Sequence, residues 1–186
     1  RFNAKANPVP SKTSHNTMIE VVWTVIPILI LLVIAVPSFR LLYDQATPEA
    51  DMTIKATGYQ WYWGYEYPDH GDIAFDALML EEDELQPGQP RLLSTDYAVV
   101  VPVDTTVRVL VTAADVIHNW AMPSFGVKMD AYPGRLNETW FRANKTGTYY
   151  GQCSELCGKS HAYMPITVEV VSQEKYDEWL AGAIEE

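Results

Sequence analysis

The chain has 186 residues, of which 48% are hydrophobic, and it carries a formal net charge of −11. This length suits one domain with an additional segment, and the hydrophobic content is that of a folded protein. The negative charge argues against nucleic acid as a partner and favours a basic protein or a cation.

The first predicted element is a membrane helix. Val21–Phe39 contains 19 residues without a charged side chain. At about 1.5 Å per residue this segment spans roughly 28 Å, close to the hydrocarbon thickness of a bilayer. It is longer than the apolar part of a signal peptide, and no A-x-A cleavage site follows it. Pro27 and Pro37 are expected to kink the helix, which neighbouring helices can tolerate.

The basic residues around this helix predict its orientation. Only Arg40 follows the span closely, whereas three basic residues precede it: Arg1, Lys5 and Lys12. The N-terminal side is therefore expected in the cytoplasm or the equivalent compartment. Among the 24 acidic residues only Glu20 precedes Asp44, so the negative charge belongs to the exported part.

Four segments are predicted along the chain: a cytoplasmic-side loop at 1–16, a membrane helix at 17–43, a linker at 44–51 and an exported domain at 52–186. Thr17-Met18-Ile19-Glu20 fits the capping-box pattern at the start of the helix.

The exported domain is predicted to be mainly β. Short apolar or alternating runs separated by Gly and Pro turns indicate strands at 52–57, 60–67, 73–80, 98–103, 106–112, 116–121, 138–143, 148–152 and 166–171. Many short strands of this kind are typical of a sandwich or a small barrel. Residues 172–183 predict a short C-terminal helix with one apolar face: Tyr176, Trp179, Leu180 and Ala183.

The segment GQCSELCGKSHAYMP holds both cysteines, in the spacing Cys153-x3-Cys157-x3-His161-x2-Met164. A disulfide suits an oxidising compartment, but a bridge between residues four apart is often forbidden by geometry. Zinc sites usually have two- or four-residue gaps and do not use methionine. A thioether beside thiolate and imidazole is instead typical of copper electron-transfer sites.

Two thiolates can bridge two copper ions, and each ion would then need its own imidazole. His118 is the candidate for the second imidazole, because it lies in a predicted strand ahead of the ligand loop. His15 lies on the other side of the predicted membrane helix, and His70 lies in an acidic turn.

The segment QWYWGYEY is rich in aromatic residues and is followed by acids. Trp61 shares its strand parity with Trp63, Tyr65 and Tyr67, whereas Tyr62 has the opposite parity. Some rings are therefore expected at the surface, where aromatic side chains surrounded by acids indicate a docking site. Four acids follow closely: Glu66, Asp69, Asp72 and Asp76.

Four segments resemble, in the family's own order, subunit II of haem–copper cytochrome c oxidases. The cysteine segment is similar to the loop of its dinuclear copper centre, CuA. The segment ADVIHNWAMPSFGVKMDAYPGRLNETWF is similar to the family's histidine-bearing segment, and ATGYQWYWGYEYPD is similar to its aromatic segment. The segment TMIEVVWTVIPILILLVIAVPSFRLLY resembles the family's second membrane helix. The family usually has an earlier membrane helix, so we expect a segment upstream of Arg1. The resemblance implies a cupredoxin-like β-barrel or sandwich.

The resemblance also implies a ligand set. One copper ion would be held by His118 and Met164, the other by His161 and the backbone carbonyl of Glu155, with Cys153 and Cys157 bridging both. The Glu155 carboxylate would bind magnesium or manganese at the boundary with the catalytic subunit, since carboxylate oxygen suits such an ion.

The resemblance implies that electrons enter at Trp61. Acids that would attract a basic cytochrome c are Glu66, Asp69, Asp72, Asp96 and Asp115. Such steering mainly raises the association rate and is sensitive to salt. Glu20 has two interpretations, a helix cap or the entrance of a proton path.

The sequence thus favours the electron-accepting subunit of a proton-pumping oxidase in an inner or cell membrane, with its copper domain on the periplasmic or intermembrane-space side. Expected partners are subunit I, which would hold the haem, other oxidase subunits, cytochrome c and lipid. Alternatives are a membrane-anchored copper carrier acting alone, and a β-domain with a disulfide and only a binding role. The two cysteines exclude a quinol-oxidase subunit.

Overall fold

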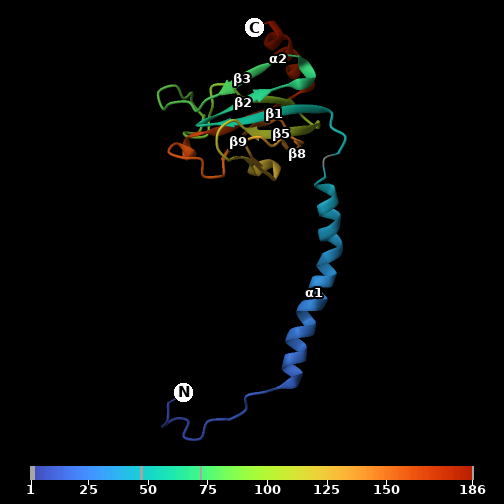
Figure 1. The fold of residues 1–186 in the computed structure, drawn as a ribbon, viewed down its shortest axis with the longest axis vertical. Coiled ribbons are helices and arrows are strands. Elements are labelled where there is room, and N and C mark those ends of the chain that lie inside the picture. Colours follow the sequence, from blue (N-terminus) through green and yellow to red (C-terminus); the bar gives the residue numbers. More distant parts are fainter. Residues whose placement is uncertain (1–2, 47, 72, 186) are drawn as a thin grey trace. The chain divides into compact units, whose positions relative to one another are not determined.

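The computed structural model describes residues 3–46, 48–71 and 73–185 (Figure 1). The chain forms two compact units, residues 1–44 and 45–186, and each is described here by itself. The first contains one long helix, and the second is mainly β.

Helix α1 covers Thr17–Asp44 and contains both Pro27 and Pro37. None of its side chains is buried within the protein, although almost all of them are apolar. Among the described residues it is the one helix long and apolar enough to cross a membrane. The predicted helix is confirmed in position, and it has the length and the all-round apolar character that a membrane span needs.

The start of α1 corrects the predicted capping box. The Ile19 N–H donates to Asn16 Oδ1 at 3.2 Å, so the capping side chain belongs to Asn16. Thr17 is already helical, and the Glu20 carboxylate lies 2.9 Å from His15 Nδ1. Asparagine is a strong cap, and here it stands one position ahead of the threonine. The capping interpretation of Glu20 was therefore wrong.

The second unit is a sandwich of two five-stranded sheets (Figure 1). The first sheet has the order β3 (Ala74–Ala77), β2 (Tyr62–Glu66), β1 (Met52–Tyr59), β5 (Thr106–Ala113) and β8 (Asn137–Arg142). The second has the order β4 (Val99–Pro102), β10 (Pro165–Val171), β9 (Gly147–Cys153), β6 (His118–Met122) and β7 (Val127–Ala131). The pairs β1/β5 and β4/β10 are parallel, and the other pairs are antiparallel.

The core lies between the inward faces of the two sheets. β1 and β5 alternate buried and half-buried residues along their whole length, as a strand with one inward face must. In β6 every residue is buried, including the polar His118 and Asn119. A fully buried strand that begins with histidine needs polar partners for that ring inside the protein.

Helix α2 (Gln173–Glu185) confirms the predicted C-terminal helix and packs against β4, the edge strand of the second sheet, and against Tyr67. The Trp179 ring lies 5.1 Å from that of Tyr67 and 5.7 Å from that of Tyr176, centroid to centroid. Tyr67 is fully buried, and its hydroxyl accepts from Val100 N–H and donates to Val100 C=O. These contacts tie the helix to the core.

Each predicted strand overlaps an observed one, and the mainly β fold is confirmed. β7 (Val127–Ala131) was missed, although its five residues alternate between apolar and charged side chains. The predicted strand at 60–67 begins only at Tyr62, since residues 60 and 61 form the turn after β1. This turn explains why Trp61 is half-buried although it shares its parity with three buried rings. Three short 3-10 helices complete the unit: Pro68–His70, Pro123–Phe125 and His161–Tyr163.

Candidate metal centre

Two adjacent strands of the second sheet, and the loop that follows one of them, carry the candidate ligands. His118 begins β6 and Cys153 ends β9, and these strands pair with Trp120 opposite Cys153. The loop from β9 to β10 then supplies Cys157, the 3-10 turn that starts at His161, and Met164 just before β10. The pairing of β6 with β9 therefore brings together His118 and Cys153, which are 35 positions apart in the sequence.

The candidate ligand atoms surround one small volume. Cys153 Sγ lies 3.8 Å from Cys157 Sγ, and 3.9 Å from His118 Nδ1. Cys157 Sγ lies 3.5 Å from both His161 Nδ1 and Met164 Sδ. Both cysteines are free and buried, and their sulfur atoms are too far apart for the roughly 2.05 Å bond of a disulfide.

The donor set suits copper. The ligand atoms of His118, Cys153 and Cys157 all lie within 4.8 Å of one another, and all three side chains are buried. The thioether of Met164 is 1% exposed and faces the same thiols. Thiolates, imidazoles and a thioether together favour copper over zinc, magnesium or calcium. The Glu155 C=O accepts from Cys153 Sγ at 3.3 Å, which places a carbonyl oxygen beside the same sulfur.

The two thiols differ in acidity. Burial opposes ionisation of Cys153, but hydrogen bonds from His118 and from nearby backbone N–H groups outweigh it and lower its pKa to about 7. Burial raises the pKa of Cys157 to about 12, and the neighbouring charge of Cys153 adds to that shift. The pair therefore holds one thiolate near neutral pH, which is the form that binds metal.

Asp115 holds the far side of the His118 ring. Its Oδ1 lies 2.8 Å from His118 Nε2 and accepts from Val116 N–H, while its Oδ2 accepts from Gln60 N–H. Burial alone would raise the Asp115 pKa, but these hydrogen bonds, led by that of His118, hold it below its usual value. The ring itself is fully buried.

Gly58 makes room for this histidine. A Cβ at Gly58 would lie 2.7 Å from His118 Cδ2 and 2.9 Å from Cγ, well inside van der Waals contact. The Trp63 ring covers another side of the imidazole, with centroids 6.0 Å apart in an edge-on arrangement. Close packing on these sides leaves His118 little room to turn.

Trp61 contacts the cysteine loop directly. Its Nε1–H donates to Cys157 C=O at 3.2 Å, and the Gln60 side-chain amide donates to the same oxygen at 2.8 Å. Beside Trp61 is a cavity of about 400 Å³, also lined by Leu78, Met79, Glu81, Ser160 and Tyr163. The sequence interpretation missed Gln60 and Glu81, because neither residue is close in sequence to a ligand.

The candidate docking acids lie at different places on the domain. Glu66 pairs with Lys55 at 2.7 Å, and Asp69 accepts from Thr53 N–H. Thr53 lies six residues before Tyr59 in β1, so Asp69 is roughly 20 Å along the strand from the Trp61 turn. Asp96 accepts from Leu78 N–H, close to the cavity beside Trp61, and Asp72 lies outside the described residues. Of this set, Asp96 and Asp115 are near Trp61.

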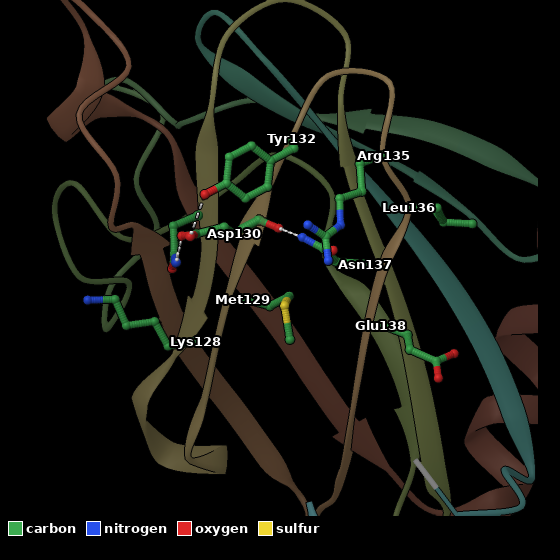
Figure 2. A pocket seen from close by; sticks show the side chains of 9 residues that line it. Lys128, Met129, Asp130, Tyr132, Arg135, Leu136, Asn137 and Glu138 are labelled. Atoms are coloured by element: carbon green, nitrogen blue, oxygen red, sulfur yellow. Dashed lines mark hydrogen bonds between the residues drawn. The ribbon is translucent and has the colours of Figure 1, made fainter. Parts of the chain in front are cut away.

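A second cavity, of about 710 Å³, lies over β7 and the start of β8 (Figure 2). Asp130 is at its centre, where it accepts from Tyr132 O–H at 3.3 Å and from the Asn119 side-chain amide at 2.7 Å. In Figure 2 the side chains of Lys128 and Arg135 lie on different sides of Met129. Because Asn119 follows His118 and its C=O accepts from Ser154 N–H, this cavity adjoins the metal centre.

Comparison with known proteins assigns this arrangement to a family. The model "Cytochrome C oxidase subunit II, periplasmic domain" matches residues 52–171, and the corresponding transmembrane model matches residues 1–41. The chain belongs to the cytochrome c oxidase subunit II family. The resemblance found in the sequence is thereby confirmed. Membership implies a CuA copper site, for which His118, Cys153 and Cys157 fit as candidate ligands, and a membrane anchor in α1.

Relatives support the assignment along nearly the whole chain. A probable cytochrome c oxidase subunit 2 of Rickettsia bellii is 60% identical over 98% of this chain, which covers 68% of that protein. Subunit 2 of Cereibacter sphaeroides is 52% identical over 98% of this chain and 66% of its own length. For the Rickettsia felis relative the covered share is only 58%. The chain thus spans about three-fifths to two-thirds of these subunit II relatives.

Solved structures match the second unit. The periplasmic domain of cytochrome oxidase subunit II (CoxB) of Bradyrhizobium japonicum is 59% identical, with a TM-score of 0.70 over 75% of this chain and 97% of that one. A CoxB domain captured as a mixed disulfide intermediate with a thioredoxin-like protein is 60% identical, with a TM-score of 0.63 over 73% of this chain and 92% of that one.

Proposed function

We propose that this chain is the electron-accepting subunit of a cytochrome c oxidase. It takes electrons from cytochrome c at a dinuclear copper centre and passes them to haem in subunit I, where oxygen is reduced to water with proton pumping. The observation that carries the proposal is the cluster of two free thiols, two imidazoles and a thioether, all buried except the half-buried His161, in a membrane-anchored member of this family.

The ligands of the centre are His118 and Met164 for one copper ion, and His161 and the Glu155 carbonyl for the other. Cys153 and Cys157 would hold both ions, which the separation of 3.8 Å between their sulfur atoms supports. When loaded, a centre of this kind supplies reversible one-electron transfer at nearly constant geometry. The protein's part is to exclude water and to hold the ligands, which the burial of both cysteines supports.

Trp61 is the side chain through which the electron enters. Its hydrogen bond to the Cys157 carbonyl supports this role, because it joins a half-buried ring to a ligand residue. The donor is a basic cytochrome c, attracted by acids near this ring, which include Asp96, Asp115 and the newly found Glu81. Charge steering of this kind raises the association rate and weakens as salt is added.

Two further sites belong to the same assembly. The exposed Glu155 carboxylate binds magnesium or manganese at the boundary with subunit I, and its position between the two cysteines supports a link between that ion and the copper centre. Glu20, paired with His15 at the start of α1, lies at the entrance of a proton path. The copper domain lies on the periplasmic or intermembrane-space side of the inner membrane, a location that the basic residues before α1 and the family's periplasmic domain support.

Both cysteines must be reduced before metal can bind. A thioredoxin-like protein forms a mixed disulfide with the CoxB domain, and we infer that a reductase of that class acts on Cys153 or Cys157 here. Subunit I and other oxidase subunits are the expected partners within the membrane.

Metal content and spectroscopy of the full chain in detergent test the proposal. We expect two copper ions per chain and an electron paramagnetic resonance signal from one electron shared by both. Cys157→Ser should abolish the shared signal. A metal-free disulfide-bonded protein would refute the proposal.

Partner and donor need separate tests. Co-purification with a haem-bearing membrane subunit separates an oxidase from a copper carrier that acts alone. Trp61→Gln should stop electron input while leaving the copper spectrum unchanged, and normal turnover with cytochrome c would contradict the role of Trp61.

A further inference from the structure

We propose that Asp115 is a positioning residue for the proposed centre: it fixes the His118 ring and, through Gln60, the turn that presents Trp61. The metal cage and the side chain where electrons enter would then be held in one arrangement by a single carboxylate. The inference rests on the proposed function for its purpose, but the contacts that carry it belong to the protein alone.

Both carboxylate oxygens of Asp115 are used. Oδ1 accepts from Val116 N–H at 2.6 Å and lies 2.8 Å from His118 Nε2, and Oδ2 accepts from Gln60 N–H at 2.7 Å. Gln60 and Asp115 are 55 residues apart in the sequence, so this carboxylate joins the turn after β1 to the residues that lead into β6. Its side chain is only 33% exposed.

The contact with His118 selects one form of the imidazole. An ionised carboxylate can only accept hydrogen bonds, so Nε2 must carry the hydrogen. In the neutral imidazole, the form that binds metal, Nδ1 is then left with its lone pair, and it is the atom that lies 3.9 Å from Cys153 Sγ. A carboxylate behind a ligating histidine orients the ring and increases its basicity.

The contact with Gln60 also helps to fix the position of the Trp61 side chain. While its backbone N–H is held by Asp115, the Gln60 side chain donates to Cys157 C=O at 2.8 Å. The adjacent Trp61 donates to that same oxygen. Gly158 has φ +120°, and a Cβ there would lie 3.1 Å from Gln60 Nε2 and 3.2 Å from Trp61 Cζ2, so the loop backbone lies directly against this pair.

These contacts distinguish Asp115 from an acid that acts only by its charge. Asp76 provides the comparison, because it is an exposed acid near Tyr62. Burial is the largest cause that raises the pKa of Tyr62, and the charges of Asp76 and Asp115 add to this shift. Both acids therefore lie near Tyr62, but only Asp115 holds backbone N–H groups and a candidate ligand. Asp115→Asn must lose at least one of these bonds, since an amide has a single acceptor oxygen.

The test compares Asp115→Asn with Asp76→Asn, each in the full chain in detergent. The first measurement is amide hydrogen exchange at Gln60 and Val116 in the metal-free protein. The second is the rate at which the copper-loaded protein loses metal to a chelator. The third is the dependence of electron input from cytochrome c on ionic strength, which reports the loss of one charge.

We expect Asp115→Asn to raise both amide exchange and copper loss by roughly tenfold or more, because hydrogen bonds to a charged group are lost. Asp76→Asn should change each by less than twofold, while both variants reduce the salt dependence of electron input alike. If Asp115→Asn resembles Asp76→Asn in exchange and in copper loss, Asp115 is a docking acid only and the proposal is wrong.

A second variant guards against a folding failure. Gln60→Met keeps the backbone bond to Asp115 but removes the side-chain donor to Cys157. The Trp61 signal, followed with fluorotryptophan and assigned with Trp61→Phe, should become mobile, while copper retention changes little. An unchanged Trp61 signal would overturn the proposed link. If the chain binds no copper at all, the proposed function fails, whereas the exchange result in the metal-free protein still decides the role of Asp115.

Discussion

The substitution Gly58→Ala tests how tightly the fold holds the candidate ligand His118. The added Cβ would lie 2.7 Å from His118 Cδ2, so the ring must move by roughly 1 Å to restore ordinary van der Waals separation. The ring cannot move freely, because Asp115 holds Nε2 at 2.8 Å and Trp63 covers another side. A shift of that size would break the bond to Asp115 or carry Nδ1 away from the thiols.

Overpacking of this kind costs about 1–3 kcal/mol of unfolding free energy. Urea unfolding of the metal-free chain in detergent, followed by tryptophan fluorescence, measures this cost. We expect in addition that copper is lost faster and that its spectrum changes.

Gly64→Ala, on the neighbouring strand β2, is the matched control. Its Cβ would meet the ends of Asp76 and Tyr59 side chains at 3.1 Å, and these can move aside. Wild-type stability and copper retention in Gly58→Ala would refute the view that a rigid His118 is part of the centre.

Three further predictions follow from side chains around the core. Met164→Leu keeps the volume of a fully buried side chain, so it should cost less than about 1.5 kcal/mol of stability while altering the copper spectrum and retention. Tyr176→Phe should raise the free energy of unfolding by roughly 1 kcal/mol, because within the described residues the buried Tyr176 hydroxyl has no hydrogen-bond partner. Tyr67→Phe should lower the free energy of unfolding by roughly 1–3 kcal/mol, because it leaves Val100 N–H unpaired. Burial, followed by the charges of nearby acids, raises the pKa of Tyr176 from 10.0 to about 12. The folded state therefore loses stability as pH rises from 10 to 12, where the unfolded chain ionises more readily at this position, so Tyr176→Phe should unfold at higher pH in an alkaline titration.

The ligand loop could be predicted from the sequence because its geometry is local. Cys153, Cys157, His161 and Met164 lie within twelve consecutive residues, so their spacing limits which ions they can share. His118 was reached only by excluding other histidines, and its place beside Cys153 depends on the pairing of β6 with β9. The pairing of strands depends on the whole sheet, and it cannot be derived from the spacing of residues along the chain.

The outer contacts of the site were not predicted for the same reason. Asp115 was interpreted as a surface acid, because nothing in its neighbourhood in the sequence shows that Gln60 N–H will meet its carboxylate. The cap of α1 was also misplaced, although Asn16 is adjacent to the predicted Thr17. In both cases the outcome depends on the direction of a single polar side chain, and several neighbouring donors can compete for one acceptor.

Strand geometry changes which acids can guide a donor to Trp61. The sequence places Glu66 and Asp69 soon after the aromatic run, but β2 carries the chain away from Trp61 at about 3.3 Å per residue. The chain returns in the segment that contains Leu78 and Glu81, which line the cavity beside Trp61. Closeness in space therefore favours Glu81 and Asp96 over the acids that are nearest in sequence. Because screening reduces the effect of a charge over about 10 Å at 0.1 M salt, the proposed docking of a basic donor would depend mainly on the acids nearest to Trp61.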